Sequence, residues 1–195
     1  MSWSAPLPIP TALARLEAGM AYRLVLILAP QGAGKTRLLR QWAAWRIDNG
    51  LRPPGWASLT EQDNSFPVFL PHLVSAVAGI DHEFQRWMRL TPKGPRLLHA
   101  AQPPLLLSTS AEVELIDLNN TLAQAPDELA LILDEYHRIH APEIHQAVAF
   151  LLEYLPPPVH LYLAARRQPP LRLAHLRARR EMIEINPGEL STDSE

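Results

Sequence analysis

Residues 23–40, RLVLILAPQGAGKTRLLR, decide the fold: an apolar run stops at Pro30, a glycine-rich turn follows, and a helical pattern begins after the turn. A strand, a turn and a helix in this order can hold phosphate, because small residues let several backbone N–H groups converge on one anion. Gly32 and Gly34 supply that freedom, and the start of the helix adds its partial positive charge. The stretch predicts a nucleotide-phosphate site, called the cradle below (residues 29–36).

The side chains of the cradle have their own expected roles. The turn follows the pattern G-x-x-x-x-G-K-[ST], with Ala29 in place of the first glycine. Lys35, one of only two lysines in the chain, is expected to reach the β and γ phosphates, and Thr36 to offer its hydroxyl to Mg²⁺. An ordinary glycine-containing turn is the alternative. The residues expected to line the nucleotide are Pro30, Gln31, Gly32, Ala33, Gly34, Lys35, Thr36 and Arg37.

Composition limits the class of protein. A chain of 195 residues, 47% apolar and 19% charged, suits one globular α/β domain with apolar runs too short to span a membrane. The formal charge of −2 supplies no basic field for nucleic acid or a membrane surface, although residues 166–180 are locally basic. The absence of cysteine excludes disulfides and thiolate metal sites. The first residues lack the features of a secretion signal, so a cytoplasmic location is expected.

The second chemical stretch is LALILDEYH, residues 129–137, an apolar run that ends in two adjacent carboxylates. Such a run is typical of a buried parallel strand, and ligands of open α/β sheets collect at the carboxyl ends of strands. Asp134 is expected to hold Mg²⁺ through its water shell, opposite Thr36. Glu135 is expected to orient or deprotonate an attacking water. The alternative is a strand that ends in solvated acids.

A further apolar run, residues 159–167, predicts another buried strand, and Arg166 at its end is expected to reach the γ phosphate. The alternative for Arg166 is a surface arginine paired with an acid. Ahead of the first strand, Leu7, Ile9 and Leu13 are candidates for an adenine pocket, with ordinary core packing as the alternative.

The remaining pattern alternates helices and strands. The helix over residues 35–50 is expected to place Leu38, Leu39, Trp42 and Trp45 near one face, and the helix over 110–125 to place Val113, Ile116, Leu118 and Leu122 roughly on one side. Histidines 137, 140 and 145 have no compact metal-ligand spacing. The other expected elements are a helix over 11–20, a strand over 55–59, a polar turn over 60–64, helices over 68–80 and 81–90, an irregular loop over 91–110, helices over 142–155 and 169–180, and an edge strand over 181–185.

Taken together, these motifs resemble the ATPase core of the MalT-like, large LuxR-type transcription regulators, which belong to the STAND class of P-loop NTPases. The resemblance covers roughly residues 20–190. It rests on APQGAGKTRLLRQW, WASLTEQDN, LILDEYHRIHAPEIHQAVAFLLEYLPP and HLYLAARRQPPLRLAHLRARREMIEI. In the terms of that class, the cradle is the Walker A motif and the acidic strand end is the Walker B motif.

The resemblance implies a fold and a mode of action. The fold is a three-layer α/β P-loop NTPase with a five-stranded parallel sheet of the additional-strand (ASCE) type, in which the arginine-bearing strand lies between the cradle strand and the acidic strand. ATP or ADP with Mg²⁺ is the expected cofactor, with slow hydrolysis as a switch and self-association on ATP binding. The implied catalytic residues are Lys35, Glu135 and Arg166, and the implied Mg²⁺ ligands are Thr36 and Asp134.

Departures from the family accompany the likeness. Family members are several times longer and carry a lid, a sensor arm and a DNA-binding region, so the chain is expected to be an excised core or a short homologue that does not itself contact nucleic acid. Thr60 stands where the family tends to have aspartate. Residues 188–191 match only loosely the motif with which the family's lid begins. The expected organisation is a segment near the nucleotide base (1–19), the NTPase core (20–190) and a polar tail (191–195).

Two other functions compete with this one. A stand-alone P-loop kinase that acts on a small acceptor would need an arginine-rich lid, and the segment 91–110 offers only Lys93 and Arg96. A degenerate fold that serves only as an interaction module would be indicated by loss of Lys35 or of the acids, and all of them are present.

Overall fold

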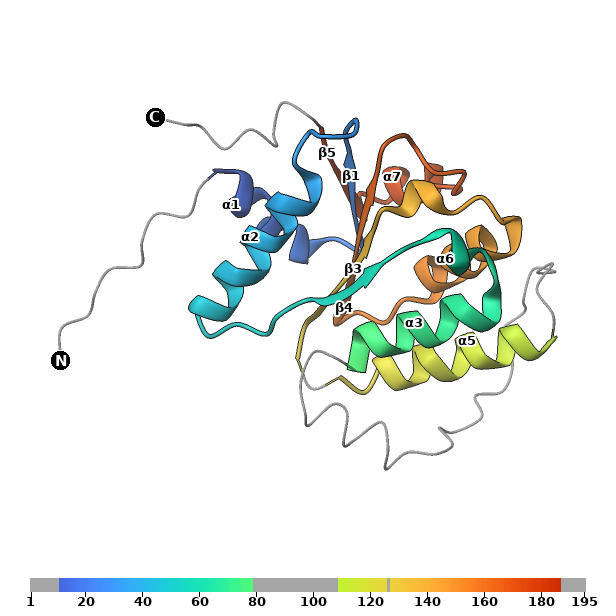
Figure 1. The fold of residues 1–195 in the computed structure, drawn as a ribbon. Coiled ribbons are helices and arrows are strands. Elements are labelled where there is room, and N and C mark those ends of the chain that lie inside the picture. Colours follow the sequence, from blue (N-terminus) through green and yellow to red (C-terminus); the bar gives the residue numbers. More distant parts are fainter. Residues whose placement is uncertain (1–10, 79–108, 126, 187–195) are drawn as a thin grey trace.

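A parallel sheet of five strands lies between two layers of helices in the computed structural model, which describes residues 11–78, 109–125 and 127–186 (Figure 1). The elements in chain order are α1 (Thr11–Ala18), η1 (Gly19–Ala21), β1 (Leu24–Leu28), α2 (Lys35–Asp48), β2 (Gly55–Ser58), η2 (Glu61–Asn64), α3 (Phe66–Ala78), α5 (Thr109–Leu122), β3 (Leu129–Asp134), η3 (Tyr136–Arg138), α6 (Pro142–Tyr154), β4 (Val159–Ala165), α7 (Ala174–Ala178) and β5 (Met182–Ile185).

The strand order is β2-β3-β4-β1-β5, and every pairing is parallel. β4 therefore lies between the cradle strand β1 and the acidic strand β3, which is the additional-strand arrangement expected from the resemblance. Leu28 pairs with Ala165, and Leu133 pairs with Leu163. Because of this register, the three central strands end at the same edge of the sheet. The predicted fold class is confirmed.

The central strands β1, β3 and β4 are buried on both faces, which explains their unbroken apolar runs. Every residue of β3 and β4 is buried. Alternate residues serve opposite layers: Leu161 and Leu163 belong to the core beneath α3, α5 and α6, whereas Tyr162 and Ala164 belong to the core beneath α1 and α2. Figure 1 shows these two helix layers on opposite sides of the sheet.

The helix that follows the cradle is fixed to α1 and to the sheet by polar contacts. The ring of Trp42 lies 4.5 Å from that of Tyr162, and the Tyr162 hydroxyl donates to the carbonyl of Leu16 at 2.8 Å. The buried guanidinium of Arg46 pairs with Glu17 at 2.7 Å, and Trp42 Nε1 donates to the same carboxylate at 2.8 Å. These contacts hold the middle and the last turn of α2 against α1 and β4.

Several expectations need correction. In α5, Val113 is 52% exposed, and the buried face carries Ala111, Leu115, Leu118 and Leu122. The helix expected over 169–180 is only α7, because Pro170 disfavours helical backbone at Pro169 and residues 171–173 form tight turns ahead of α7. Two other expectations agree with the structure. The polar turn over 60–64 is present as a 3₁₀ turn with a capping box, and the helix expected over 68–80 continues through Pro71 in α3.

Some expectations lie outside the described residues: the helix over 81–90, most of the loop over 91–110, Leu7 and Ile9, and the polar tail. Leu13 is buried in the core beneath α1 and α2. Among the described helices, none is long and apolar enough to cross a membrane.

Candidate functional site

The cradle is a turn with left-handed backbone at both of its glycines. Gly32 has φ 82° and Gly34 has φ 88°, conformations that favour glycine because other residues bring Cβ against the backbone. Gly34 is the N-cap of α2 and offers no side-chain cap to the first N–H groups of the helix. A cavity of about 240 Å³ opens in front of this turn, lined by Gln31, Gly32, Gly34, Lys35, Thr36, Arg37, Glu135 and Arg166.

Lys35 folds back over the cradle. Its ammonium donates to the carbonyl oxygens of Ala29 at 2.6 Å and Pro30 at 3.0 Å, and the residue is only 5% exposed. Burial lowers the pKa of Lys35, against an opposite effect of Glu135 and Asp134. The contacts of the ammonium are uncharged carbonyls, so an anion in the cavity would be a stronger partner than either of them.

Thr36 and Asp134 meet across 98 positions of sequence. The Thr36 hydroxyl donates to Asp134 Oδ2 at 2.8 Å, and Asp134 Oδ1 accepts from the backbone N–H of Glu135 at 2.8 Å. Asp134 is 1% exposed. A hydroxyl next to a carboxylate at the rim of a phosphate-sized cavity suits Mg²⁺, which binds through one or two protein oxygens and completes its shell with water and phosphate oxygens.

Glu135 and Arg166 face each other at the mouth of the cavity. Arg166 Nη2 lies 4.0 Å from Glu135 Oε2, and Arg166 is also near enough to Lys35 to lower its pKa. This contact agrees with the alternative for Arg166, a surface arginine paired with an acid, and the acid is Glu135. Glu135 has a left-handed backbone (φ 58°), and Arg138 Nε lies 3.6 Å from the same carboxylate oxygen.

His137 also borders Glu135, although sequence reasoning considered it only as a metal ligand. Its Nε2 lies 3.6 Å from Glu135 Oε2, and its Nδ1 is buried with no hydrogen-bond partner among the described residues. Burial lowers the pKa of His137, with Glu135 acting against that effect. No group of three or more histidine, aspartate or glutamate residues in the described part of the chain is arranged to hold a metal ion.

Asn64 is a second residue near the site, for which the sequence predicted only a place in a polar turn. Its Nδ2 donates to the carbonyl of Arg138 at 2.9 Å, and its Oδ1 accepts from the N–H groups of His140 at 2.7 Å and Ala141 at 2.9 Å. These bonds fasten the segment that leaves Glu135. We call the segment 135–141 the acidic loop.

The turn that carries Asn64 is itself rigid. The buried carboxylate of Asp63 accepts from Thr60 N at 2.7 Å and from the Thr60 hydroxyl at 2.8 Å, and it lies 2.8 Å from His72 Nδ1. Burial alone would raise the pKa of Asp63, but the hydrogen bonds from His72 and Thr60 outweigh it and lower the pKa. The spacing Thr60-x-x-Asp63 is a capping-box pattern, the sequence signal from which this turn could have been predicted.

Comparison with known proteins gives the family context. The "HTH-type transcriptional regulator MalT" of Klebsiella pneumoniae subsp. pneumoniae is 35% identical to this chain over 181 residues, which cover 92% of the chain and 18% of that protein. The protein of the same name from Vibrio cholerae is 33% identical over 188 residues, 95% of the chain and 19% of the relative. The chain is MalT-like. It spans about a fifth of the length of these curated relatives.

The MalT-like chain matches no family model. Its fold is found in the crystal structure of Cdc6p from Pyrobaculum aerophilum, with a TM-score of 0.53 and 16% sequence identity. The likeness covers 94% of the MalT-like chain and 47% of the Cdc6p chain, and at this identity it concerns the fold alone.

Proposed function

We propose that the chain is the ATP-binding switch domain of a MalT-like STAND regulator, and that it hydrolyses ATP slowly. The observation that carries the proposal is the bond between Thr36 and Asp134 at the rim of the cradle cavity. It joins the hydroxyl and the carboxylate that a P-loop NTPase needs around Mg²⁺, and the cavity beside it has left-handed glycines and a lysine. The names of the curated relatives support the regulatory context.

The residues of the cradle would hold the nucleotide. The backbone N–H groups between Gln31 and Thr36 would receive the phosphates, and Lys35 would exchange its two carbonyl partners for phosphate oxygens. Thr36 and Asp134 would hold Mg²⁺, which supplies positive charge at the β and γ phosphates when it is bound. Pro30, Ala33 and Arg37 would border the same site.

Hydrolysis would be the work of Glu135 and Arg166. Glu135 would accept a hydrogen bond from the attacking water and so orient it, because the carboxylate lines the cavity into which the γ phosphate would extend. Arg166 would place its guanidinium against the charge that develops on the transferred group. The ion pair between the two side chains would hold them on the same side of the cavity.

A nucleotide titration tests the binding part of the proposal. A fluorescent ATP analogue should bind the wild-type chain in the presence of Mg²⁺, and Lys35→Ala should weaken that binding by about 100-fold, since a charge-assisted contact is worth roughly 1.5–3 kcal/mol. Arg40→Ala removes an exposed cation from the same helix outside the cavity and is the matched control. Equal affinity in Lys35→Ala and Arg40→Ala would refute the cradle.

A turnover measurement tests the catalytic part. Glu135→Gln keeps the shape of the side chain, so it should bind nucleotide like the wild type and release phosphate at a much lower rate. The same assay separates hydrolysis from the kinase alternative, because ³¹P spectra distinguish phosphate in water from phosphate on an added acceptor. If the phosphate appears on the added acceptor, the chain is a kinase and the switch proposal is wrong.

The remaining expectations belong to this proposal. Residues 20–190 would form the NTPase core, and residues 1–19 would pack near the base. ATP would promote self-association and ADP would favour the resting state, so light scattering with ATP should give a larger mass than with ADP. An identical mass in both nucleotides would contradict this step. The cytoplasmic location stays a prediction from the sequence.

A further inference from the structure

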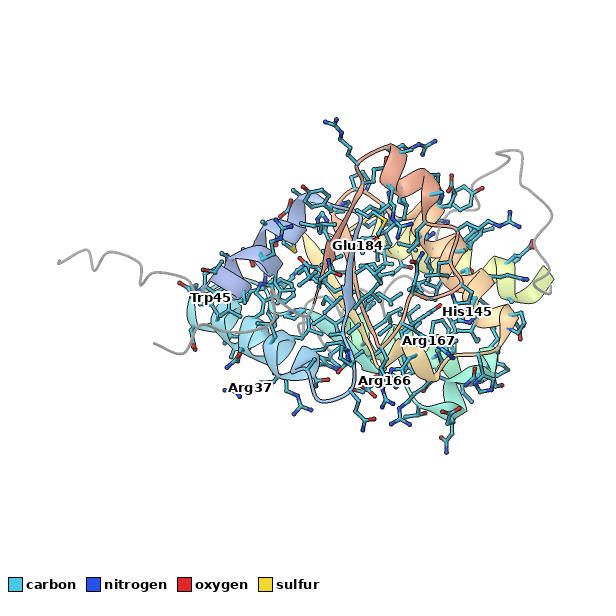
Figure 2. All side chains as sticks on the ribbon, turned by 90° about the horizontal axis from the view of Figure 1, so that it is seen from above. Arg37, Trp45, His145, Arg166, Arg167 and Glu184 are labelled. Atoms are coloured by element: carbon cyan, nitrogen blue, oxygen red, sulfur yellow. The ribbon has the colours of Figure 1, made fainter. Side chains whose placement is uncertain are left out.

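A second cavity of about 230 Å³ lies at the same edge of the sheet as the cradle. Glu135 and Arg166 line the cradle cavity, and the residues that directly follow them, Tyr136 and Arg167, line the second one. The two cavities therefore adjoin across the ends of β3 and β4. Figure 2 shows Arg166, Arg167 and His145 following one another along this side of the molecule.

The second cavity has a positive charge, Arg167, that pairs with no acid among the described residues. Arg167 is exposed and makes no ion pair with any residue that the structure describes. No aspartate or glutamate is among the described residues that line the cavity, whereas histidines 137, 140 and 145 and Gln168 are. In the cradle cavity, by contrast, Arg166 faces the carboxylate of Glu135. The lining of the second cavity suits an anion.

Tyr136 and His145 provide a fixed hydrogen-bond donor. The Tyr136 hydroxyl lies 2.9 Å from His145 Nδ1, and a tyrosine phenol carries its proton at neutral pH. Because Tyr136 is 1% exposed, that proton needs an acceptor inside the protein, and among the described residues His145 Nδ1 is the atom bonded to the hydroxyl. This hydrogen-bond pattern assigns the tautomer of His145 with its proton on Nε2, where it can donate to a ligand.

His137 would give this cavity a preference among anions. Its Nε2 faces Glu135 and its Nδ1 is buried without a partner among the described residues. With the proton on Nε2, the free Nδ1 is an acceptor, which an ion that carries its own O–H can satisfy. Hydrogen phosphate both accepts and donates, whereas sulfate only accepts at neutral pH.

We propose that this second cavity binds a small oxyanion, with hydrogen phosphate as the preferred ion. The cavity would take up the phosphate that is released from the cradle and passes Glu135 and Arg166. Arg167 and His145 Nε2 would donate to the ion, directly or through water. The binding of the ion stands on the cavity alone. The role of the cavity as a transient binding site for the hydrolysis product rests on the proposed function.

A titration with inorganic phosphate tests the site without any nucleotide. NMR of the histidine side-chain ¹⁵N resonances follows the binding of phosphate. A titration with sodium chloride at matched ionic strength is the blank. The signals of His145 and His137 should shift saturably in the wild type, in Lys35→Ala and in Arg179→Ala, an exposed arginine outside both cavities. Arg167→Ala should weaken the binding about 10-fold or more, and sulfate should bind more weakly than phosphate.

Three outcomes would overturn the site: no saturable shift, equal affinity in Arg167→Ala and the wild type, or loss of the shift in Lys35→Ala, which would place the ion in the cradle. Since Arg167 is exposed, its removal should leave the far-ultraviolet circular dichroism spectrum unchanged, which excludes misfolding as the cause of lost binding.

Inhibition by the product tests the role in release. Added phosphate should slow ATP turnover of the wild type without competing with ATP, and Arg167→Ala should be several-fold less sensitive. Inhibition that is purely competitive with ATP would overturn the release role. Absence of turnover in the wild type would refute both the proposed function and the release role, while the phosphate titration would still decide whether the oxyanion site exists.

Discussion

At the scale of single residues, the site depends on oxygen atoms that are buried and paired. The Thr36 hydroxyl gives its proton to a carboxylate that is almost fully buried, so the bond serves both stability and the geometry of the site. Removal of the hydroxyl would leave Asp134 Oδ2 without its partner, and an unsatisfied buried group costs about 1–3 kcal/mol.

Thr36→Ala should separate the effect of the hydroxyl on Mg²⁺ from the binding of the nucleotide itself. In EDTA the variant should bind an ATP analogue as the wild type does, but the gain in affinity on adding Mg²⁺ should shrink about 10-fold or more, since a contact with a charged group is worth roughly 1.5–3 kcal/mol. Thr36→Ser keeps the hydroxyl and should behave as the wild type. A Ser variant as defective as the Ala variant would contradict the role of the hydroxyl.

Asp63 makes a pH-dependent contribution to stability. Its pKa in the folded chain is lower than its ordinary value of 3.8, so the folded state prefers the carboxylate. The stabilisation is therefore present above that value and is lost as the pH falls below it. Asp63→Asn should lower the free energy of unfolding in urea by about 1–3 kcal/mol at pH 7, and the difference from the wild type should narrow below about pH 4. Asp117→Asn, at an exposed carboxylate, is the control. A difference that stays constant with pH would contradict the assignment.

At the scale of elements, the acidic loop connects β3 to α6 and carries a strained residue at its start. Glu135 is a non-glycine residue with φ 58°, a conformation that costs on the order of 1 kcal/mol and persists where the surroundings hold it. Asp134 bonds to the N–H of Glu135 at one end of the loop, and Asn64 bonds to Arg138, His140 and Ala141 at the other. η2 therefore helps to aim the Glu135 side chain.

Asn64→Ala should lower kcat for ATP by about 10-fold or more and leave KM within about 2-fold, because a misplaced Glu135 affects the chemical step and not the cradle. Asn64→Asp keeps the acceptor for His140 and Ala141 but loses the donor to Arg138, so its kcat should be intermediate. Urea denaturation of the same variants measures any loss of stability separately. Reduced stability together with an unchanged kcat would mean that Asn64 has a structural role only.

At the scale of the whole molecule, the sheet brings distant segments to one edge. Residues 29–36, 134–137 and 165–170 are far apart in sequence and adjacent in space because β1, β4 and β3 are neighbours in parallel register. A ligand that contacts all three segments would stabilise the chain against global unfolding, because its binding site exists only while the strands stay together.

Mg²⁺·ATP at about 100 times its Kd should therefore stabilise the chain by about 2.7 kcal/mol. For a domain of this size, that gain raises the melting temperature by about 5–10 °C. Differential scanning calorimetry would measure the shift, and Lys35→Ala should lose it. A shift of the same size in Lys35→Ala would show that the nucleotide binds elsewhere.

The sequence by itself determined the local features of this protein. Left-handed glycines at 32 and 34, the start of α2 at Lys35 and the full burial of β3 and β4 all follow from short-range sterics and from apolar periodicity. Apolar periodicity gave wrong predictions where packing against neighbouring elements sets the buried face or the end of a helix. Val113 is apolar and exposed, because the face of α5 that meets the core lies on another side of the helix.

Only the tertiary structure decided which polar groups meet. Thr36 lies 98 positions from Asp134, and Asn64 lies 74 positions from Arg138, so no local rule pairs them without the strand order. The resemblance to a known family supplied that order for Thr36 and Asp134, but the bonds of Asn64 and the cavity beside Arg167 became visible only in the folded chain. Hydrogen bonds and cavities depend on distances between elements, and those distances are set by packing of the whole core.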